Sequence, residues 1–228
     1  AESLRPLVDG PRHVVLNVSH YYEHKNLGDL LDAAGCAARN VPDIGLVLTA
    51  GLTQYHGPWT ERTRRDVALA RDLIEQGRLV DLGPVDKPCV WKLMAMADLF
   101  AFPSSLESFG HPLLEAMSVG LPVLAADTPI HREICGNAAR YHGVADPESL
   151  ARRLADMLPA VATDRVEAGI QRAARFSWDR HAGDLCRAIL ELGGDATEPS
   201  ADAVAPPKSA RPVGPIRTTA GSSASTNW

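Results

Sequence analysis

The chain has 228 residues, of which 45% are apolar, and a formal net charge of −5. This is enough for one globular domain with additional segments, and the mild negative charge gives no reason to expect a nucleic-acid partner. Four scattered cysteines, Cys36, Cys89, Cys135 and Cys186, form no C-x-x-C pair. They indicate buried, reduced thiols in a cytosolic protein and argue against a disulfide framework or a metal site.

No apolar run approaches the length of a membrane span, and no secretory signal precedes the first predicted strand. We therefore expect a cytoplasmic protein, with a peripheral position at the inner face of the membrane as a second option. Residue 1 is alanine, and we expect the chain to be a piece of a longer polypeptide, with residues 1–11 as a linker.

Strand and helix patterns alternate along the chain. Short apolar segments predict strands over 13–19, 44–50, 78–83, 98–103, 121–127 and 138–142. Helical periodicity covers 26–38, 60–76, 88–97, 110–119, 147–157, 165–175 and 176–192, with a helical turn at 131–135. Asn26 is the expected N-cap of the first helix. Strands that recur with helices between them predict an α/β fold, a Rossmann-like, doubly wound parallel sheet over residues 12–192.

Residues 193–228 are rich in Gly, Pro, Ser, Thr and Ala and lack apolar periodicity. Such a segment buries too little surface to offset its ordering entropy, so we expect a disordered tail. Ligands of open parallel sheets bind beyond the carboxyl ends of the strands. His20, Lys25, Gly51, Glu107 and Asp127 fall at those ends, which predicts one shared crevice.

The segment from Pro103 to Asp127 reads PSSLESFGHPLLEAMSVGLPVLAAD. A small-residue turn at 108–110 precedes a helix, and a helix N-terminus offers unpaired N–H groups and a positive dipole end to a phosphate. Glu115 lies about five residues, or roughly 7 Å, into that helix, near the reach from a diphosphate to its ribose. Glu107 would face the other side of the diphosphate, where a sugar would sit. The alternative is a purely structural role, with Glu115 as a solvated helix residue and Glu107 as a helix-capping acid.

The pattern ESFG-x-P-x-x-EAM-x-x-G-x-P-V at 107–123 resembles the signature of the donor-binding domain of retaining GT-B glycosyltransferases, the large family-four group (glycosyl transferases group 1). The resemblance covers about residues 12–192 and implies the C-terminal half of a GT-B fold. It implies transfer of a sugar from a UDP- or GDP-sugar to a glycan or lipid-linked acceptor with retention of configuration. An N-terminal Rossmann-like half, in cis or in trans, is the implied partner, and the isolated chain is expected to be inactive in transfer.

In the resembling family, the loop at 19–26 carries an arginine and, five residues later, a lysine, which both contact the donor diphosphate. Lys25 matches the lysine, whereas His20 stands at the arginine position and lacks the fixed charge and bidentate fork of a guanidinium. No D-x-D carboxylate pair occurs, and the family needs neither metal nor cofactor because the lysine and the helix dipole offset the diphosphate charge. A metal held by His20, His24 and nearby acids is the alternative.

The resemblance assigns catalysis to Lys25, which stabilises the departing diphosphate, and to Glu107, which orients the sugar, while Glu115 binds the ribose. No nucleophile for a double displacement can be assigned. The full set of donor-binding candidates is His20, Lys25, Gly51, Gly83, Val85, Glu107, Ser108, Phe109, Gly110, His111, Leu114 and Glu115.

Several candidates have two explanations. Gly83 and Val85 either hold the nucleobase edge or serve the turn after their strand, and His111 either reaches the sugar or caps the helix. Tyr21 and Tyr22 either line the cleft or pack. The FSW motif at 176–178 resembles the start of the family's last helix, which crosses back to the other domain, and it also suits a capping helix with Trp178 in the core. Two other functions stay open: a non-catalytic nucleotide-sugar-binding subunit and a sugar-nucleotide epimerase.

Overall fold

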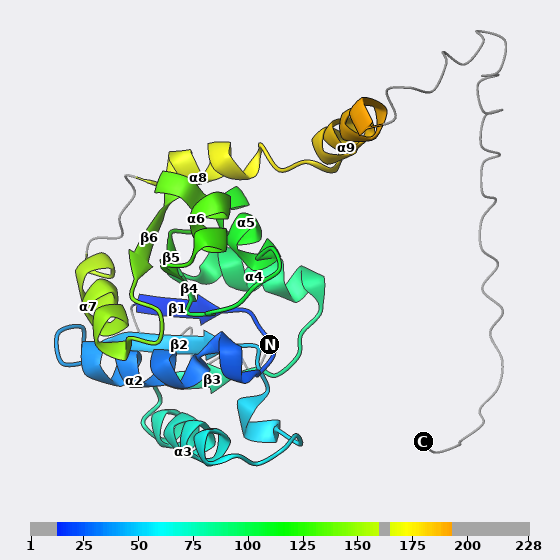
Figure 1. The fold of residues 1–228 in the computed structure, drawn as a ribbon. Helices are drawn as coiled ribbons and strands as arrows, with labels where there is room; N and C mark the ends of the chain where they lie inside the picture. Colours follow the sequence, from blue (N-terminus) through cyan, green and yellow to red (C-terminus); the bar gives the residue numbers. More distant parts are fainter. Residues whose placement is uncertain (1–12, 160–164, 193–228) are drawn as a thin grey trace, which may run out of the picture. The chain divides into compact units, whose positions relative to one another are not determined.

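The computed structural model describes residues 13–159 and 165–192. Within them, six strands form one sheet in the order β3-β2-β1-β4-β5-β6, and every neighbouring pair is parallel (Figure 1). The strands are β1 His13–Asn17, β2 Ile44–Leu48, β3 Leu79–Asp81, β4 Leu99–Phe102, β5 Val123–Ala126 and β6 Ala139–His142. Each predicted strand is confirmed, with shorter ends in all six cases. The doubly wound, Rossmann-like α/β prediction is therefore correct.

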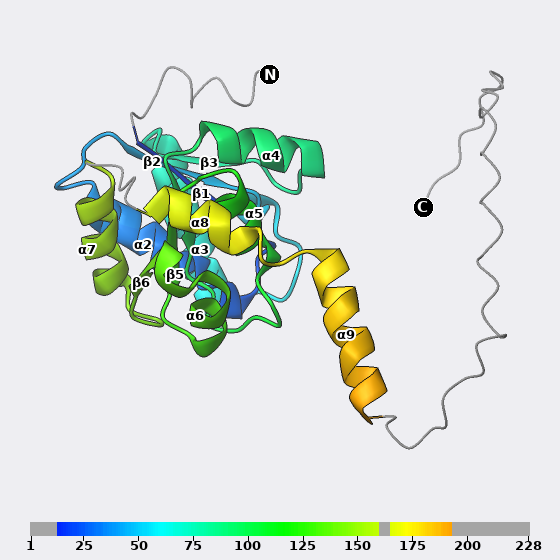
Figure 2. The same cartoon turned by 90° about the horizontal axis from the view of Figure 1, so that it is seen from above.

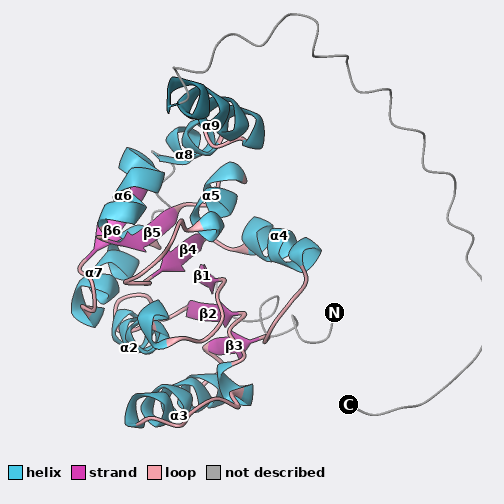
Figure 3. Cartoon of the chain, turned by 45° about the vertical axis from the view of Figure 1, so that its right-hand side comes forward, coloured by secondary structure: helices cyan, strands magenta, loops and turns pink. Residues whose placement is uncertain are grey.

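Helices cover both faces of the sheet, as the secondary-structure colouring in Figure 3 shows. On one face lie α2 Leu27–Ala37, α3 Glu61–Glu75 and α7 Pro147–Met157; on the other lie α4 Lys87–Met96, α5 His111–Ser118, α6 Pro129–Cys135 and α8 Val166–Ala173. Helix α8 packs against α5 (Figure 2). Short 3₁₀ turns occupy Glu23–Lys25, Leu52–Gln54 and Gly136–Ala138.

The strands feed two separate hydrophobic cores because successive side chains of a strand point to opposite faces. In β2, Leu46 and Leu48 join the core under α2, α3 and α7, whereas Val47 joins the core under α4 and α5. In β4, Phe100 and Phe102 face the second core. Strands buried on both faces read as continuous apolar runs, which explains why the sequence located them.

Four helix starts have the expected capping chemistry. Thr60, Asp86, Thr128 and Asp146 each accept a hydrogen bond from the amide three residues on, as N-cap residues do. Asn26 occupies the N-cap position of α2, but its side chain caps nothing there. Its Nδ2 donates to the Pro103 carbonyl instead, so this asparagine ties two loops together.

The chain divides into two units, residues 1–183 and 184–228. Helix α9, Trp178–Leu192, contains the boundary, and its part from Asp184 to Leu192 is all that the structure describes of the second unit. Trp178 is 80% exposed, so the alternative that placed it in the core is wrong. Cys36 and Cys186 are exposed as well, and of the four cysteines only Cys135 is fully buried, so the expectation of buried thiols is correct for Cys135 alone. The expected linker at 1–11 and the expected tail at 193–228 lie outside the described residues.

Two histidines are buried: His131 in α6 and His142 at the end of β6. The Nδ1 atoms of His131 and His142 lie 2.8 Å from the carbonyl oxygens of Ala126 and Gly143. Among the described residues, neither Nε2 atom has a hydrogen-bond partner. Burial lowers the pKa of both imidazoles below the ordinary value of 6.5, because a charge without a partner is costly inside a protein.

We expect these histidines to make the fold acid-sensitive. Below pH 6.5 these histidines bind protons in the unfolded chain but not in the folded chain. Their effect on the free energy of unfolding is therefore absent above pH 6.5, and the free energy of unfolding falls as the pH drops from 6.5 towards the lower pKa of the folded state. Each histidine can contribute up to about 1.4 kcal/mol per pH unit to this loss. Urea unfolding between about pH 7.5 and 5.5 measures it. His131→Asn and His142→Asn keep a donor for the carbonyl and should flatten the pH profile; profiles parallel to the wild type would contradict this explanation.

Candidate functional site

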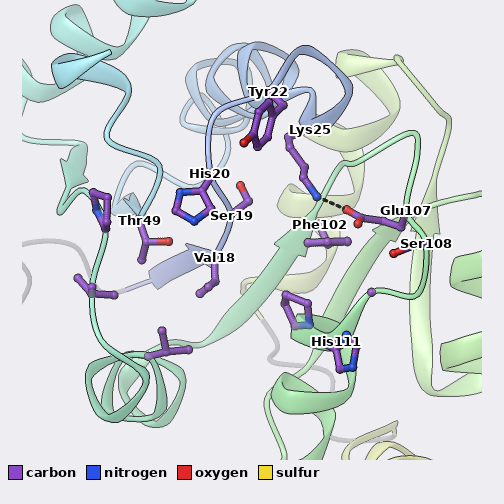
Figure 4. A pocket seen from close by; sticks show the side chains of 15 residues that line it. Val18, Ser19, His20, Tyr22, Lys25, Thr49, Phe102, Glu107, Ser108 and His111 are labelled. Atoms are coloured by element: carbon purple, nitrogen blue, oxygen red, sulfur yellow. Dashed lines mark hydrogen bonds and ion pairs between the residues drawn. The ribbon is translucent and has the colours of Figure 1, made fainter. Parts of the chain in front are cut away.

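A pocket lies where the chain leaves β1 towards one face of the sheet and leaves β4 towards the other. In the strand order 3-2-1-4-5-6 this is the topological switch point, where open α/β sheets bind ligands. The pocket has a volume of about 380 Å³. It is lined by Val18, Ser19, His20, Tyr22, Lys25, Thr49, Pro84, Val85, Val90, Phe102, Glu107, Ser108, Gly110, His111 and Pro112 (Figure 4).

An ion pair joins the two loops that form the pocket. Figure 4 shows Lys25, from the β1–α2 loop, and Glu107, from the β4–α5 loop, pointing toward each other. The Lys25 Nζ atom lies 2.6 Å from Glu107 Oε1, and their side chains are 16% and 12% exposed. The Lys25 ammonium also lies 5.7 Å from the centre of the Phe102 ring. Lys25 is the only Lys or Arg among the lining residues in the described part of the chain.

Backbone contacts hold the loop that carries Lys25. The His24 carbonyl accepts hydrogen bonds from the Ser105 amide, at 2.8 Å, and from the hydroxyls of Ser104 and Ser105, both at 3.2 Å. Three donors on one carbonyl bind the β1–α2 loop to the β4–α5 loop. This fixes the backbone immediately before Lys25 next to the segment that leads into Glu107.

A second anchor lies at the start of the same loop. Tyr21 is buried, and its hydroxyl donates to Asp66 Oδ2 of α3 at 2.9 Å. Burial raises the pKa of Tyr21 to about 12 and also raises the pKa of the Asp66 carboxyl. The packing explanation of Tyr21 is therefore correct, while Tyr22, 58% exposed, lines the pocket.

The N-terminus of α5 opens into the pocket. Gly110 precedes the helix with φ 94°, and no side chain caps the first turn. A φ of this sign strains any residue with a Cβ, and a Cβ here would also lie 3.1 Å from Leu113 Cδ1. Gly110 therefore permits the sharp turn at the start of α5. Pro112 has no N–H and the Leu113 amide donates to the Gly110 carbonyl, so α5 offers an anion in the cavity the His111 amide and the positive end of the helix dipole.

Glu115, in the same helix, lies outside the pocket lining. Its Oε1 atom forms an ion pair with Lys87 Nζ at the start of α4. The Lys87 ammonium also lies 5.3 Å from the centre of the Trp91 ring. The Glu115 side chain is 19% exposed. A carboxylate has several acceptor sites, so Glu115 keeps acceptor capacity for a hydroxyl.

Gly51 and Gly83 are organised by a residue that sequence reasoning missed. Asp81, the last residue of β3, accepts hydrogen bonds from the amides of Gly51, Thr53 and Gly83 at 3.0, 3.1 and 3.3 Å. Both glycine amides are thus occupied within the fold, and neither glycine lines the pocket. For Gly83 this bond supports the explanation as a turn residue, whereas Gly51 lines a hollow that adjoins the pocket.

Comparisons with known proteins show the family of the chain. Residues 5–168 match the family model described as glycosyl transferases group 1. The chain belongs to this family. It is 35% identical over 180 residues to a D-inositol 3-phosphate glycosyltransferase of Salinispora tropica, covering 74% of this chain and 35% of that protein. It is 28% identical over 194 residues to a phosphatidyl-myo-inositol mannosyltransferase of Mycobacterium tuberculosis, covering 81% of this chain and 48% of that protein.

Solved structures with similar folds are also glycosyltransferases or related synthases. A sucrose-phosphate synthase of Thermosynechococcus elongatus superposes with a TM-score of 0.67 at 22% identity, over 86% of this chain and 50% of that one. Anabaena HepE in complex with UDP and glucose superposes with a TM-score of 0.64 at 21% identity, over 84% of this chain and 52% of that one. The group 1 chain therefore spans about half the length, or less, of the proteins that it matches.

In this group 1 glycosyltransferase chain, the structure brings most of the predicted donor-binding residues together. The pocket lining includes His20, Lys25, Val85, Glu107, Ser108, Gly110 and His111. Phe109 and Leu114 pack instead against the core under α5, and the Phe109 ring lies 4.8 Å from the ring of His111. His111 is exposed at the rim, which suits contact with a ligand.

Other residues depart from the expected set. Ser19, Thr49 and Pro84 line the pocket of this group 1 chain and were not predicted. Each of the three lies at or next to the end of a predicted strand. Because ligands bind beyond the carboxyl ends of the strands, this position could have identified them as pocket residues. Asp127 was expected near the crevice, but both of its oxygens accept hydrogen bonds from Arg132. This interaction lowers the pKa of Asp127.

The described part of this group 1 chain has neither a cluster of metal ligands nor a membrane-spanning helix. Residues 13–159 and 165–192 contain no group of three or more His, Cys, Asp or Glu side chains placed to hold a metal ion. Within the same ranges, every helix falls short of the length and apolar content that crossing a bilayer requires.

Proposed function

We propose that this chain is the donor-binding, C-terminal half of a retaining GT-B glycosyltransferase, which binds a UDP- or GDP-sugar without a divalent metal and transfers the sugar to a glycan or lipid-linked acceptor. The observation that carries the proposal is the Lys25–Glu107 pair, placed at the switch point beside the uncapped N-terminus of α5. The partner is an N-terminal Rossmann-like half that supplies the acceptor site, in cis or in trans.

The charges of the pocket suit a nucleoside diphosphate sugar. Lys25, the His111 amide and the positive end of the α5 dipole would bind the diphosphate and stabilise the negative charge that develops as the sugar leaves. Glu107, on the other side of Lys25, would accept hydrogen bonds from the sugar hydroxyls. The similar Anabaena structure holds UDP and glucose, which supports this class of ligand. The half-length match to the relatives supports assignment to one half of the enzyme.

Glu115 is proposed to bind the ribose through the oxygen that Lys87 leaves available. This arrangement gives the two glutamates different roles: Glu115 contacts a part of the donor that UDP retains, whereas Glu107 contacts the sugar. The roles of Glu107 and Glu115 can therefore be separated by comparing the affinity for UDP with the affinity for UDP-glucose.

Glu115→Gln should weaken the binding of UDP and of UDP-glucose to the same extent, by about 1.5–3 kcal/mol, because the hydrogen-bond acceptor at this position loses its charge. Glu107→Gln should leave UDP binding unchanged or tighter, because a carboxylate beside the diphosphate is removed, and should reduce the preference for UDP-glucose over UDP. Isothermal titration calorimetry of the two variants with both ligands measures these changes.

Lys87→Ala is the matched control for Glu115. It removes the partner of the carboxylate but leaves the carboxylate in place, and an exposed ion pair contributes little to stability, about 0–1 kcal/mol. Its effect on UDP should be smaller than that of Glu115→Gln. If both glutamate variants lost the same affinity for both ligands, the division of roles would be wrong.

A further inference from the structure

A second hollow adjoins the donor pocket. Its volume is about 630 Å³, and its walls come from the β1–α2 loop and from the segment between β2 and α3. His20, Tyr22 and Pro84 line both hollows. The two therefore form one continuous depression, and a molecule in the second hollow, called the side groove below, would lie next to the donor.

Aromatic rings form one wall of the side groove. Tyr55 packs edge-on against the buried Tyr21, with ring centres 5.0 Å apart and planes at 75°. Trp59 supports Tyr55 from another side, with ring centres 6.1 Å apart. Tyr55 is thus held in place by its neighbours while it lines the groove. A fixed aromatic ring is a suitable surface for the C–H groups on the apolar face of a sugar.

Hydrogen-bonding side chains without a permanent charge form the rest of the groove. Gln54 and His56 are exposed, and their side chains make no hydrogen bond to any described residue. The Tyr22 hydroxyl is also exposed and without such a bond. An amide, an imidazole and a phenol can each donate to and accept from hydroxyl groups. Their arrangement around aromatic rings matches the two kinds of surface that a pyranose ring presents.

The side groove differs from the donor pocket in the charge of its lining. Among the lining residues that the structure describes, none carries a carboxylate, an ammonium or a guanidinium group. A phosphate would find no counter-charge there, and a hydrocarbon chain would leave the amide, imidazole and phenol groups without partners. The lining therefore favours a neutral, polyhydroxylated ligand.

We propose that the side groove binds a neutral hexose unit of the acceptor, so that the donor-binding half itself contributes to acceptor recognition. The proposal rests on the donor function proposed above, because the groove is useful to transfer only if a sugar nucleotide occupies the adjoining pocket. The ligand is a glycan or the sugar part of a glycolipid.

The test is a two-ligand titration of the full chain followed by ¹H–¹⁵N NMR. Methyl α-D-glucopyranoside, methyl α-D-mannopyranoside and maltose are the saccharide probes, and UDP is the nucleotide probe. At least one saccharide should shift the amides of Gln54, His56 and Gly57 saturably, with millimolar affinity. UDP should instead shift the amides of Gly110 and His111.

Variants assign the binding to the groove. The double variant Gln54→Ala/His56→Ala should weaken saccharide binding about tenfold, as expected for two lost hydrogen bonds, and leave UDP binding unchanged. Gln76→Ala, an exposed glutamine at the end of α3, is the matched control and should change neither. Gly57→Ala is a second variant that should also weaken saccharide binding. A Cβ at this position would collide with the Tyr55 hydroxyl and displace the ring.

The outcomes separate this proposal from the donor function. If UDP bound but no saccharide shifted the amides of Gln54, His56 and Gly57, the proposed saccharide site in the side groove would be wrong, and the proposed donor site would stand. Equal saccharide affinity in wild type and in the double variant would overturn it as well. Saccharide binding without UDP binding would support a sugar site but overturn its role in acceptor recognition together with the donor function.

Discussion

Replacing Lys25 with methionine is expected to weaken UDP binding by about 1.5–3 kcal/mol, or roughly 10- to 150-fold. Methionine keeps the unbranched side chain up to the ε position but removes the ammonium group, which is the only Lys or Arg charge in the described lining of the donor pocket. It also leaves the Glu107 carboxylate, which is 12% exposed, facing the diphosphate without a counter-charge. Calorimetric titration with UDP measures the loss.

Two further variants show whether the charge itself causes the loss. Lys25→Met/Glu107→Gln removes the repulsion and should recover part of the affinity. Lys92→Met is the matched control, because Lys92 is exposed on α4 and away from the pocket lining, and it should bind UDP like the wild type. Unchanged UDP binding in Lys25→Met would show that the ammonium does not contact the diphosphate.

The second large effect concerns the whole reaction. We expect this chain alone to transfer no sugar, although it binds the donor. Transfer requires the acceptor hydroxyl to be held about 3–3.5 Å from the anomeric carbon, and such positioning contributes on the order of 7–11 kcal/mol to catalysis. The donor pocket is open in this chain, and water remains the available acceptor. Slow hydrolysis of the donor is the most that we expect.

A radiolabelled-sugar assay with the purified chain tests this expectation. The assay is run with maltose as acceptor, with and without an added N-terminal half from a similar group 1 enzyme. Rapid transfer by the chain alone would contradict the assignment to one half of the enzyme and would locate a complete acceptor site within these residues. An acceptor-independent change of the sugar would instead favour the epimerase alternative.

The sequence predicted the strands β2, β4 and β5 well because they are buried on both faces. A strand such as β2 must be apolar at every position, and this continuous pattern is hard to confuse with a surface helix. The strand ends were predicted too long. Residues such as Ser19 and Thr49 follow the last ladder position and line the ligand pocket instead, so the pattern of apolar residues does not mark where pairing stops.

The site was predicted in part. Lys25, Glu107 and Gly110 could be placed because the turn before α5 and the strand ends follow from local sequence. The partners of Glu115 and of the two glycines could not, because Lys87 and Asp81 reach them across different elements. Such contacts depend on how α4 and β3 lie beside α5 and β2, and periodicity carries no information about that. The exposure of Trp178 could not be predicted for a related reason, because the local sequence does not show whether an aromatic residue at a helix start packs against another element.

The central claim is that the pocket at the switch point binds a nucleoside diphosphate sugar through Lys25 and the N-terminus of α5, without metal. The most direct measurement is calorimetry of the full chain with UDP-glucose and with GDP-mannose in the presence of a chelator. We predict saturable one-to-one binding of at least one donor, with no gain on adding magnesium or manganese ions. Binding that appeared only with a divalent metal, or no binding of either donor, would contradict the account.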